Sequence, residues 1–444
     1  MQSRAHVAGL LLLSSLLLLL FSSLTKSASP LQALSRACTP SANLHKQPTL
    51  NVFVTDLPPE LNYGLLHEYW DFQRSSDTEK SSTDTGRSSS ISRVKISTGE
   101  FLTKSVHIPL YPDDPLIKQY SAEYWLLGDL ITPANERSNS VARRVWNSSL
   151  ADVIFVPFFA TLSAELQLHQ AKGKFRHKKE NADYDRQVRV LELVKNSPEW
   201  KRSQGRDHVF VLTDPVAMWH VRSEIAPAVL LTVDFGGWYM EDAKEVENQE
   251  GPLDVISHRQ VSLLKDVIVP YTHLLPPLHP ADDKQRGTLL YFKGARHRHR
   301  TGLVRDKLWA LLKDEPGVVF EEGFPNKTGR EQALKGMRSA DFCLHPAEFS
   351  LFVAVHNALQ PKFLVNYLKG ISAQRKRSMR TRLANAQQFF EYDNGYPGGI
   401  GPVKGAVNAI WNKVSDKVPA IKEAVARERR KPLDVSVPAR CQCL

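Results

Sequence analysis

The sequence predicts an α/β protein with two domains, each built around a parallel sheet. Its 444 residues are too many for one hydrophobic core. Short β-branched and aromatic runs alternate with segments whose apolar residues recur at helical spacing, which is the order that produces parallel sheets. A proline-rich stretch at residues 274–287 separates two such series and predicts a linker. The composition, 42% hydrophobic and 24% charged, is ordinary for globular protein.

Several segments flank or interrupt these domains. The uncharged apolar run at residues 7–24 predicts a signal-anchor over residues 1–24, with a cleaved signal peptide as the alternative. In both cases the chain enters the secretory pathway. Composition further predicts a stem, a mobile polar tract and a C-terminal tail, at residues 25–48, 73–98 and 431–444 respectively.

The first domain is predicted over residues 49–280. Helices are expected at residues 116–130 and 184–194, where apolar residues recur at helical spacing. Five β-branched runs are typical of buried parallel strands. These are LNVFV from Leu50, ADVIFVPFF from Ala151, DHVFVLTD from Asp207, AVLLTVDF from Ala228 and KDVIVPY from Lys265.

Three residues of the first domain are candidates for a catalytic base. Asp214 and Asp234 each follow a predicted strand, and ligands bind at the carboxyl edge of such sheets. His208 is the third candidate, although it stands where its strand begins. Each aspartate also has a purely structural interpretation, as a loop carboxylate that caps a turn.

The second domain is predicted over residues 287–430. Strands are expected in GTLLYFKGA, GVVFEEG and ADFCLHP. Between the first two lies a helix whose Val304, Leu308, Leu311 and Leu312 share one face. The last strand pattern, residues 340–346, passes with only Ala347 between into a helical pattern over residues 348–359, and no turn chemistry separates the two.

Basic residues crowd the first strand-to-helix turn of this second domain. Lys293, Arg296 and Arg305 could pair with a pyrophosphate at the helix N-terminus, where Gly294 permits close approach. The alternative is a solvated basic loop. The histidines of this stretch, His297 and His299, have no carboxylate or cysteine nearby, so neither a metal nor another cofactor is expected.

The charge balance points to an anionic partner. The net charge is +11 and the pI is about 9.3. Nucleic acid is excluded as a partner by the secretory N-terminus and by the absence of interleaved aromatic and basic motifs. Two sequons, which begin at Asn147 and Asn326, are consistent with a lumenal body that carries N-linked glycans.

Motifs across residues 50–444 resemble the exostosin-type glycosyltransferase family, and most closely its plant arabinosyltransferase-like members. They include PLIKQYSAEYWLLGDL, ADVIFVPFFATLSAELQL, GRDHVFVLTDP, KDVIVPYTHLLP, YFKGARHRHRTGLVRDKL and FEYDNGYPGGIGP. The resemblance implies a GT-B fold of two Rossmann-like domains facing a cleft, in a type II Golgi membrane protein. It further implies a nucleotide-sugar donor, a cell-wall polysaccharide acceptor and inverting, metal-independent transfer. Arabinose is the first choice of sugar, with xylose or galactose behind it.

The same resemblance indicates a deletion between Ala347 and Glu348. Members of the family continue there with one further strand-and-helix unit, which forms much of the donor pocket, so the second domain is expected to be incomplete. We therefore hold two hypotheses. The chain is a glycosyltransferase whose short form has doubtful activity, or it is an inactive family member that binds polysaccharide or pairs with an active partner in a complex.

Overall fold

The structure of the protein is a computed structural model. It describes residues 50–82, 100–103, 106–133, 135, 140–214, 216–233, 262–272, 286–295, 299–323, 327–343, 351, 353–392 and 405–430. The predicted signal-anchor, stem and C-terminal tail lie outside these residues, as does the predicted linker up to residue 285. Within the described ranges, no helix has the length and apolar character needed to cross a bilayer.

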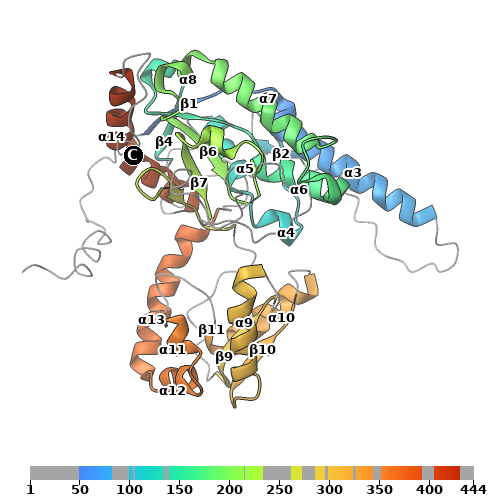
Figure 1. Ribbon diagram of the computed structural model, residues 1–444, viewed down its shortest axis with the longest axis vertical. Coiled ribbons are helices and arrows are strands. Elements are labelled where there is room, and N and C mark those ends of the chain that lie inside the picture. The colour runs from blue at the N-terminus through green and yellow to red at the C-terminus, as the bar shows by residue number, and fades with distance from the viewer. Residues whose placement is uncertain are drawn as a thin grey trace, which may run out of the picture. The chain divides into compact units, whose positions relative to one another are not determined.

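A parallel six-stranded sheet organises the first part of the chain, with strand order β4-β1-β5-β6-β7-β8 (Figure 1). Its strands are β1 Leu50–Val54, β4 Ala142–Val145, β5 Val153–Phe155, β6 His208–Leu212, β7 Val229–Thr232 and β8 Val267–Ile268. All five strands predicted for this domain are present. The edge strand β4 was not predicted, because its sequence ARRV lacks the apolar run of a buried strand. A separate antiparallel hairpin joins β2, Glu100–Thr103, to β3, Val106–Pro109.

Helices cover the first sheet. They are α3 Tyr63–Ser82, α4 Pro115–Lys118, α5 Ala122–Ile131, α6 Ala160–Ala171, α7 Ala182–Asn196 and α8 Pro198–Ser203. The single helix predicted at residues 116–130 is divided into α4 and α5. Part of the tract predicted to be mobile, residues 73–98, is helical, because α3 continues to Ser82; its mobility stays a prediction. The first turns of α3 are anchored by the buried Leu65, Leu66 and Tyr69, and extending a helix costs far less than nucleating one.

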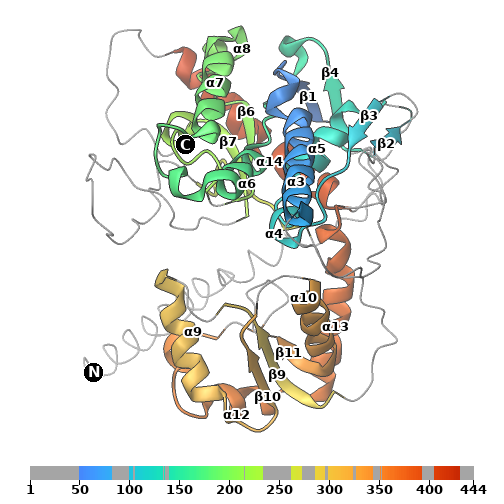
Figure 2. The ribbon, with the colours of Figure 1, turned by 90° about the vertical axis from the view of Figure 1, so that its right-hand side faces the viewer.

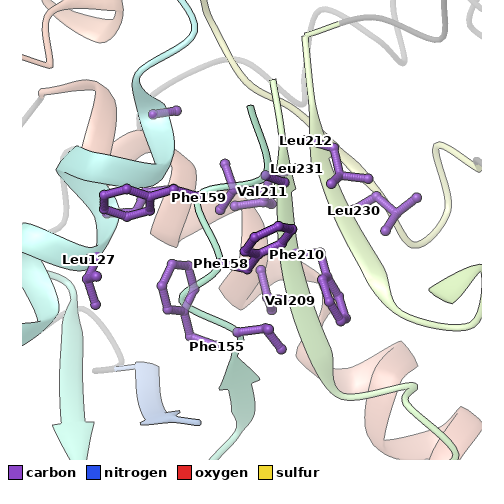
Figure 3. Close-up of a cluster of buried hydrophobic side chains, with 14 of the residues drawn as sticks. Leu127, Phe155, Phe158, Phe159, Val209, Phe210, Val211, Leu212, Leu230 and Leu231 are labelled. Carbon is purple, nitrogen blue, oxygen red and sulfur yellow. The ribbon is translucent and has the colours of Figure 1, made fainter. Parts of the chain in front are cut away.

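The core of the first sheet is apolar and aromatic. Figure 3 shows side chains of β5, β6 and β7 packing with those of α5 and of the segment between β5 and α6. Phe155 and Phe210 are each 1% exposed, and Phe159 is fully buried. This packing fixes the ends of the strands, and so fixes the backbone that carries the polar residues at the sheet's carboxyl edge.

A smaller parallel sheet forms in the second part of the chain, with order β10-β9-β11 (Figure 2). Its strands are β9 Thr288–Lys293, β10 Val318–Glu321 and β11 Ala340–Cys343. Each lies within a predicted strand. Two parallel sheets with intervening helices confirm the predicted α/β class and agree with a GT-B-like, Rossmann-type fold.

The helices of this second part are α9 His299–Leu312, α10 Lys327–Ser339, α11 Val355–Ala358, α12 Phe363–Lys369 and α13 Ala373–Gln387. Leu308 and Leu312 of α9 and Leu364 and Leu368 of α12 share a core with β9 and β10. Of the helical pattern predicted over residues 348–359, the described part contains α11, and α12 begins beyond the end of that pattern. The proposed junction at residues 347–348 lies outside the described residues.

The last helix, α14 at Ala406–Arg429, packs on the first sheet and not on the second. Trp411 is fully buried, lies 5.8 Å from Phe155 between ring centroids and donates to Asp129 at 3.1 Å. Asn408 accepts from the backbone N–H of Val141 at 2.9 Å. The predicted second domain extended to residue 430, so the structure corrects that boundary: the chain returns to the first sheet before it ends.

Candidate functional site

The carboxyl edge of the first sheet carries Asp214 in a fixed position. The residue before it, Thr213, donates its hydroxyl to the carbonyl of Tyr120 at 2.5 Å. Asp214 donates its backbone N–H to the Thr161 hydroxyl at 3.3 Å, and its carboxylate accepts the N–H of Val216 at 2.7 Å. Asp214 is 5% exposed. Its position agrees with the prediction that it lies at the ligand-binding edge, and its role as a base stays a prediction.

A second carboxyl group, which the sequence did not suggest, contacts Asp214. Glu165 of α6 is hydrogen-bonded to Asp214, and its side chain is 14% exposed. Burial, followed by the charge of Asp214 and this hydrogen bond, raises the pKa of Glu165 well above its ordinary value. The contact therefore favours a proton on Glu165 that it can share with Asp214.

Two further buried acids surround the start of α6. Phe159 cannot cap this helix, and Glu123 of α5 does so instead, accepting the N–H groups of Thr161 at 3.1 Å and Leu162 at 3.0 Å. Burial raises the pKa of Glu123 to about 8, although these hydrogen bonds work against the increase. Burial also raises the pKa of Asp183 to about 6, although it accepts hydrogen bonds from Ser163 and Gln187.

A buried tyrosine hydroxyl interacts electrostatically with the same carboxyl groups. Tyr111 is 9% exposed, and its hydroxyl is buried without a hydrogen-bond partner among the described residues. Burial, followed by the charges of Glu123, Glu165 and Asp214, raises the pKa of this hydroxyl well above its ordinary value. A buried, unpaired hydroxyl is costly in a folded protein, so this one is a candidate contact for a bound hydroxyl group.

His208 lies at the opposite edge of the sheet. It begins β6 and Asp214 follows the end of that strand, so roughly 20 Å of extended backbone separates them at ~3.3 Å per residue. His208 is fully buried and hydrogen-bonded to Asp207 at 2.8 Å. Burial opposes ionisation of Asp207, but bonds from His208 and Ser203 outweigh it and lower its pKa. The structure therefore does not bring His208 and Asp214 into one site.

The remaining candidate base and the two sequon asparagines are only partly described. Asp234 and Asn326 lie outside the described residues. Asn147 is exposed, and its side chain accepts the N–H of Ser149 at 2.9 Å. This exposure is compatible with a glycan, and glycosylation at Asn147 stays a prediction.

The basic turn of the second sheet brings Lys293, Gly294 and Arg305 together. Lys293 ends β9 and bonds Glu321 at 3.0 Å and Gln332 at 2.9 Å. The next residue, Gly294, donates to the carbonyl of Glu321 at 3.1 Å. Arg305 of α9 donates to the carbonyl of Ala295 at 2.7 Å. A phosphate at this turn would have to compete with Glu321 for Lys293. The fourth predicted member, Arg296, lies outside the described residues.

The histidine, cysteine and acidic side chains near these sites are the groups that could bind a metal ion. In the ranges that the structure describes, no group of three histidine, cysteine or acidic side chains is arranged to hold a metal ion. The carboxyl groups near Asp214 instead bond one another, backbone N–H groups and hydroxyl groups.

Two parallel sheets, one with buried carboxyl groups at its carboxyl edge and the other with a basic strand end, define an α/β transferase of the GT-B-like type. The exostosin GT47 domain matches residues 46–360, and the chain therefore belongs to this family of glycosyltransferases. The family implies a nucleotide-sugar donor and a polysaccharide acceptor. No solved structure matches the chain with significance.

Three relatives from Arabidopsis thaliana are similar to this chain. "Probable arabinosyltransferase ARAD1" is 28% identical over 438 residues, which cover 90% of this chain and 85% of that protein. "Probable xyloglucan galactosyltransferase GT20" is 24% identical over 213 residues, 46% of this chain and 35% of that protein. "Xyloglucan-specific galacturonosyltransferase 1" is 22% identical over 216 residues, 46% of this chain and 30% of that protein.

Proposed function

We propose that this chain transfers arabinose from a nucleotide-sugar donor to a plant cell-wall polysaccharide, with inversion at the anomeric carbon. The family match supports sugar transfer, and the relative named as an arabinosyltransferase, which aligns with most of the chain, supports the choice of sugar. Galactose is the second choice, because a relative that aligns with 46% of the chain is named as a galactosyltransferase. Xylose was the other alternative raised by the family resemblance.

In this proposal, the first domain supplies the base and the second holds the leaving group. A carboxylate at the edge of the first sheet removes the acceptor's proton as its oxygen attacks the anomeric carbon. Lys293 and Arg305 stabilise the departing nucleoside diphosphate without a metal. The grouping of Asp214 with buried carboxyl groups is the observation that carries this proposal.

The cellular location is a further part of the proposal. The apolar run at residues 7–24 would anchor the protein in the Golgi membrane as a single-pass type II protein with a lumenal body. This run lies outside the described residues, so its support is its length and its lack of charge. Protease protection of intact vesicles tests it, and digestion of the body without detergent would contradict it.

A second function is favoured by the proposed deletion after Ala347. The alignment with the arabinosyltransferase-named relative spans 438 residues but covers only 90% of this 444-residue chain, so it includes positions that only the relative fills. The second sheet contains three strands among the described residues. An incomplete donor domain would favour a non-catalytic subunit that binds polysaccharide or joins an active partner.

One assay separates these two functions. The chain from residue 25 is supplied with nucleoside-diphosphate sugars, including arabinose, galactose, xylose and galacturonic acid, and with arabinan or xyloglucan oligosaccharides. Transfer of one sugar supports the enzyme. Binding of an oligosaccharide without transfer supports the non-catalytic subunit. That result requires that sequencing of the transcript finds the segment missing at this junction every time.

A further inference from the structure

We propose that Glu165 and Asp214 act as one proton-sharing carboxyl pair that deprotonates the acceptor hydroxyl, while the Tyr111 hydroxyl positions that hydroxyl. The proposal rests on the proposed function and names residues for its base. It assigns catalytic roles to Glu165 and Tyr111, neither of which the sequence suggested.

The first support is the geometry of the pair. Asp214 stands just past β6 at the carboxyl edge, and Glu165 lies in α6, which begins at the same edge after β5. Their carboxyl groups are hydrogen-bonded, and two carboxyl groups in contact cannot both ionise readily. Asp214 is held by the N–H of Val216, whereas the side chain of Glu165 reaches solvent with 14% of its surface. The pair is therefore fixed on one side and accessible on the other.

The charges around the pair favour retention of a proton. Asp114 interacts unfavourably with an ionised Glu165, and Glu123 and Asp183 each interact unfavourably with Asp214. His169 lies on the same helix, with its Nε2 3.9 Å from Glu165 Oε2, and would favour ionised Glu165 when its ring is protonated. Burial, followed by the charges of nearby acids that include Glu165, also raises the pKa of the hydroxyls of Tyr69 and Tyr111.

The second, independent support is the Tyr111 hydroxyl. It is buried, has no hydrogen-bond partner among the described residues and interacts electrostatically with both members of the pair. A native protein rarely leaves such a group unpaired unless it serves a ligand or a functional site. A sugar hydroxyl could accept a hydrogen bond from Tyr111 while donating its own proton to the pair.

The reaction step balances as follows. The acceptor O–H bond breaks and its proton passes to the ionised carboxylate of the pair. The acceptor oxygen forms a bond to the anomeric carbon, and the bond from that carbon to the diphosphate oxygen breaks, with the electron pair leaving on the nucleoside diphosphate. Glu165 then returns the extra proton to solvent, because it is the more exposed member of the pair.

The kinetic test uses Glu165→Gln, Asp214→Asn and their double variant, with the exposed Glu192→Gln as a matched control. Each single variant should lower kcat about 10²- to 10⁴-fold, the usual contribution of general base catalysis. Because the pair acts as a unit, the double variant should lose little more than the worse single variant. Glu192→Gln should transfer at the wild-type rate. Losses that multiply in the double variant, or an active Glu165→Gln variant, would overturn the pair.

A second readout does not depend on transfer. At neutral pH the wild-type chain should show an infrared C=O stretch from protonated carboxyl groups. The component that Glu165 contributes should be lost in Glu165→Gln, whereas the component from Glu123, whose pKa is raised to about 8, should remain. In Asp214→Asn the Glu165 component should titrate at lower pH, because the charge of Asp214 helps to raise the pKa of Glu165. A Glu165 titration that Asp214→Asn does not move would contradict proton sharing.

Tyr111→Phe separates a role in binding from a role in folding. Removing an unpaired buried hydroxyl should leave thermal stability unchanged or slightly higher, while KM for the oligosaccharide acceptor should rise several-fold. Lower stability with an unchanged KM would assign Tyr111 a structural role and remove it from the proposal. A wild-type chain that binds arabinan oligosaccharides but transfers no sugar would contradict the proposed function. The pair would then be judged by the infrared titration, and Tyr111 by the effect of Tyr111→Phe on oligosaccharide affinity.

Discussion

At the residue scale, burial decides how each acidic side chain of the first sheet behaves. Glu123 and Asp183 are 1% and 0% exposed, and burial raises the pKa of both. Asp207 is also largely buried, but a histidine, a serine and an arginine compensate for the lost solvent and lower its pKa. The first two therefore bind protons at neutral pH more readily than free carboxylic acids do, whereas Asp207 stays ionised.

The free energy of unfolding should fall as pH rises from about 6.5 to about 8. A group whose pKa is raised on folding contributes stability that is complete below its unfolded pKa and is lost as pH rises through its folded pKa. For Glu123, whose folded pKa is about 8, the loss is about 2 kcal/mol over this range. His220 has a lowered pKa and works in the opposite direction, but only below its unfolded pKa of about 6.5.

Urea unfolding at half-unit pH steps measures this slope. Glu123→Gln should flatten it, whatever its effect on absolute stability, and Glu192→Gln on the exposed face of α7 should leave it unchanged. A wild-type slope of zero or of positive sign above pH 6.5 would contradict the assignment of protonated, buried carboxyl groups near α6.

His208 should matter for folding and not for sugar transfer. His208→Phe keeps an aromatic ring against Trp200, whose ring centroid lies 5.0 Å away, but removes the hydrogen bond to Asp207. Leaving Asp207 with fewer partners should lower the free energy of unfolding by about 1 to 3 kcal/mol. Denaturant titration measures this, and affinity for an oligosaccharide acceptor should not change. A weakened affinity at unchanged stability would restore His208 as a site residue.

At the element scale, close packing of α10 on β9 depends on a glycine. A Cβ atom at Gly336 would lie 2.0 Å from Tyr291 Cζ, and Tyr291 is 3% exposed. Gly336→Ala gains about 1 kcal/mol in helix propensity, but overpacking a buried site typically costs about 1 to 3 kcal/mol. Because the overlap involves a buried ring, we expect net destabilisation. Gly370→Ala is the control, since a Cβ atom there would lie 3.5 Å from the carbonyl oxygens of Asn366 and Tyr367, and equal melting temperatures for the two variants would contradict the expectation.

Helix α14 should be required for the stability of the first sheet. Trp411→Ala removes a fully buried indole and its hydrogen bond to Asp129, and a change of this kind costs about 3 to 5 kcal/mol. Trp411→Phe should cost less, because it keeps the ring contact with Phe155. Thermal unfolding followed by aromatic circular dichroism measures both. If Trp411→Ala were as stable as wild type, α14 would not be part of this core.

The sequence predicted the elements better than their partners. Strands buried on both faces have nearly continuous apolar runs, so β5, β6 and β7 could be found from residues alone. The half-buried β1 and β9 also carry β-branched or aromatic runs, which made them recognisable. Helical periodicity predicts that α14 has an apolar face, but not which sheet that face covers. Asp214 could be found because a carboxylate that follows a strand is a recognisable pattern. Glu165 could not, because one acid within a helix most often faces solvent.

At the scale of the whole molecule, the proposed missing unit should be the main determinant of donor binding. Reinstating the family's segment after Ala347 should give measurable affinity for a nucleoside diphosphate and raise the melting temperature of the second domain, because it covers apolar surface. Calorimetry measures the first effect and differential scanning calorimetry the second. A Gly/Ser insert of equal length is the control, and should do neither. Equal affinity for both inserts would contradict a deletion of functional residues.

The return of α14 to the first sheet also affects the order in which the protein can fold during synthesis. Protein domains generally fold as units as the ribosome releases them, N-terminal domain first. Here the first sheet obtains Trp411 and Ile410 only after every residue of the second sheet has been synthesised. The apolar surface of the N-terminal core therefore stays uncovered while more than a hundred further residues are synthesised. Chaperones would have their longest contact with this intermediate, and a premature stop just before residue 406 would leave the first sheet without the part of its core that α14 supplies.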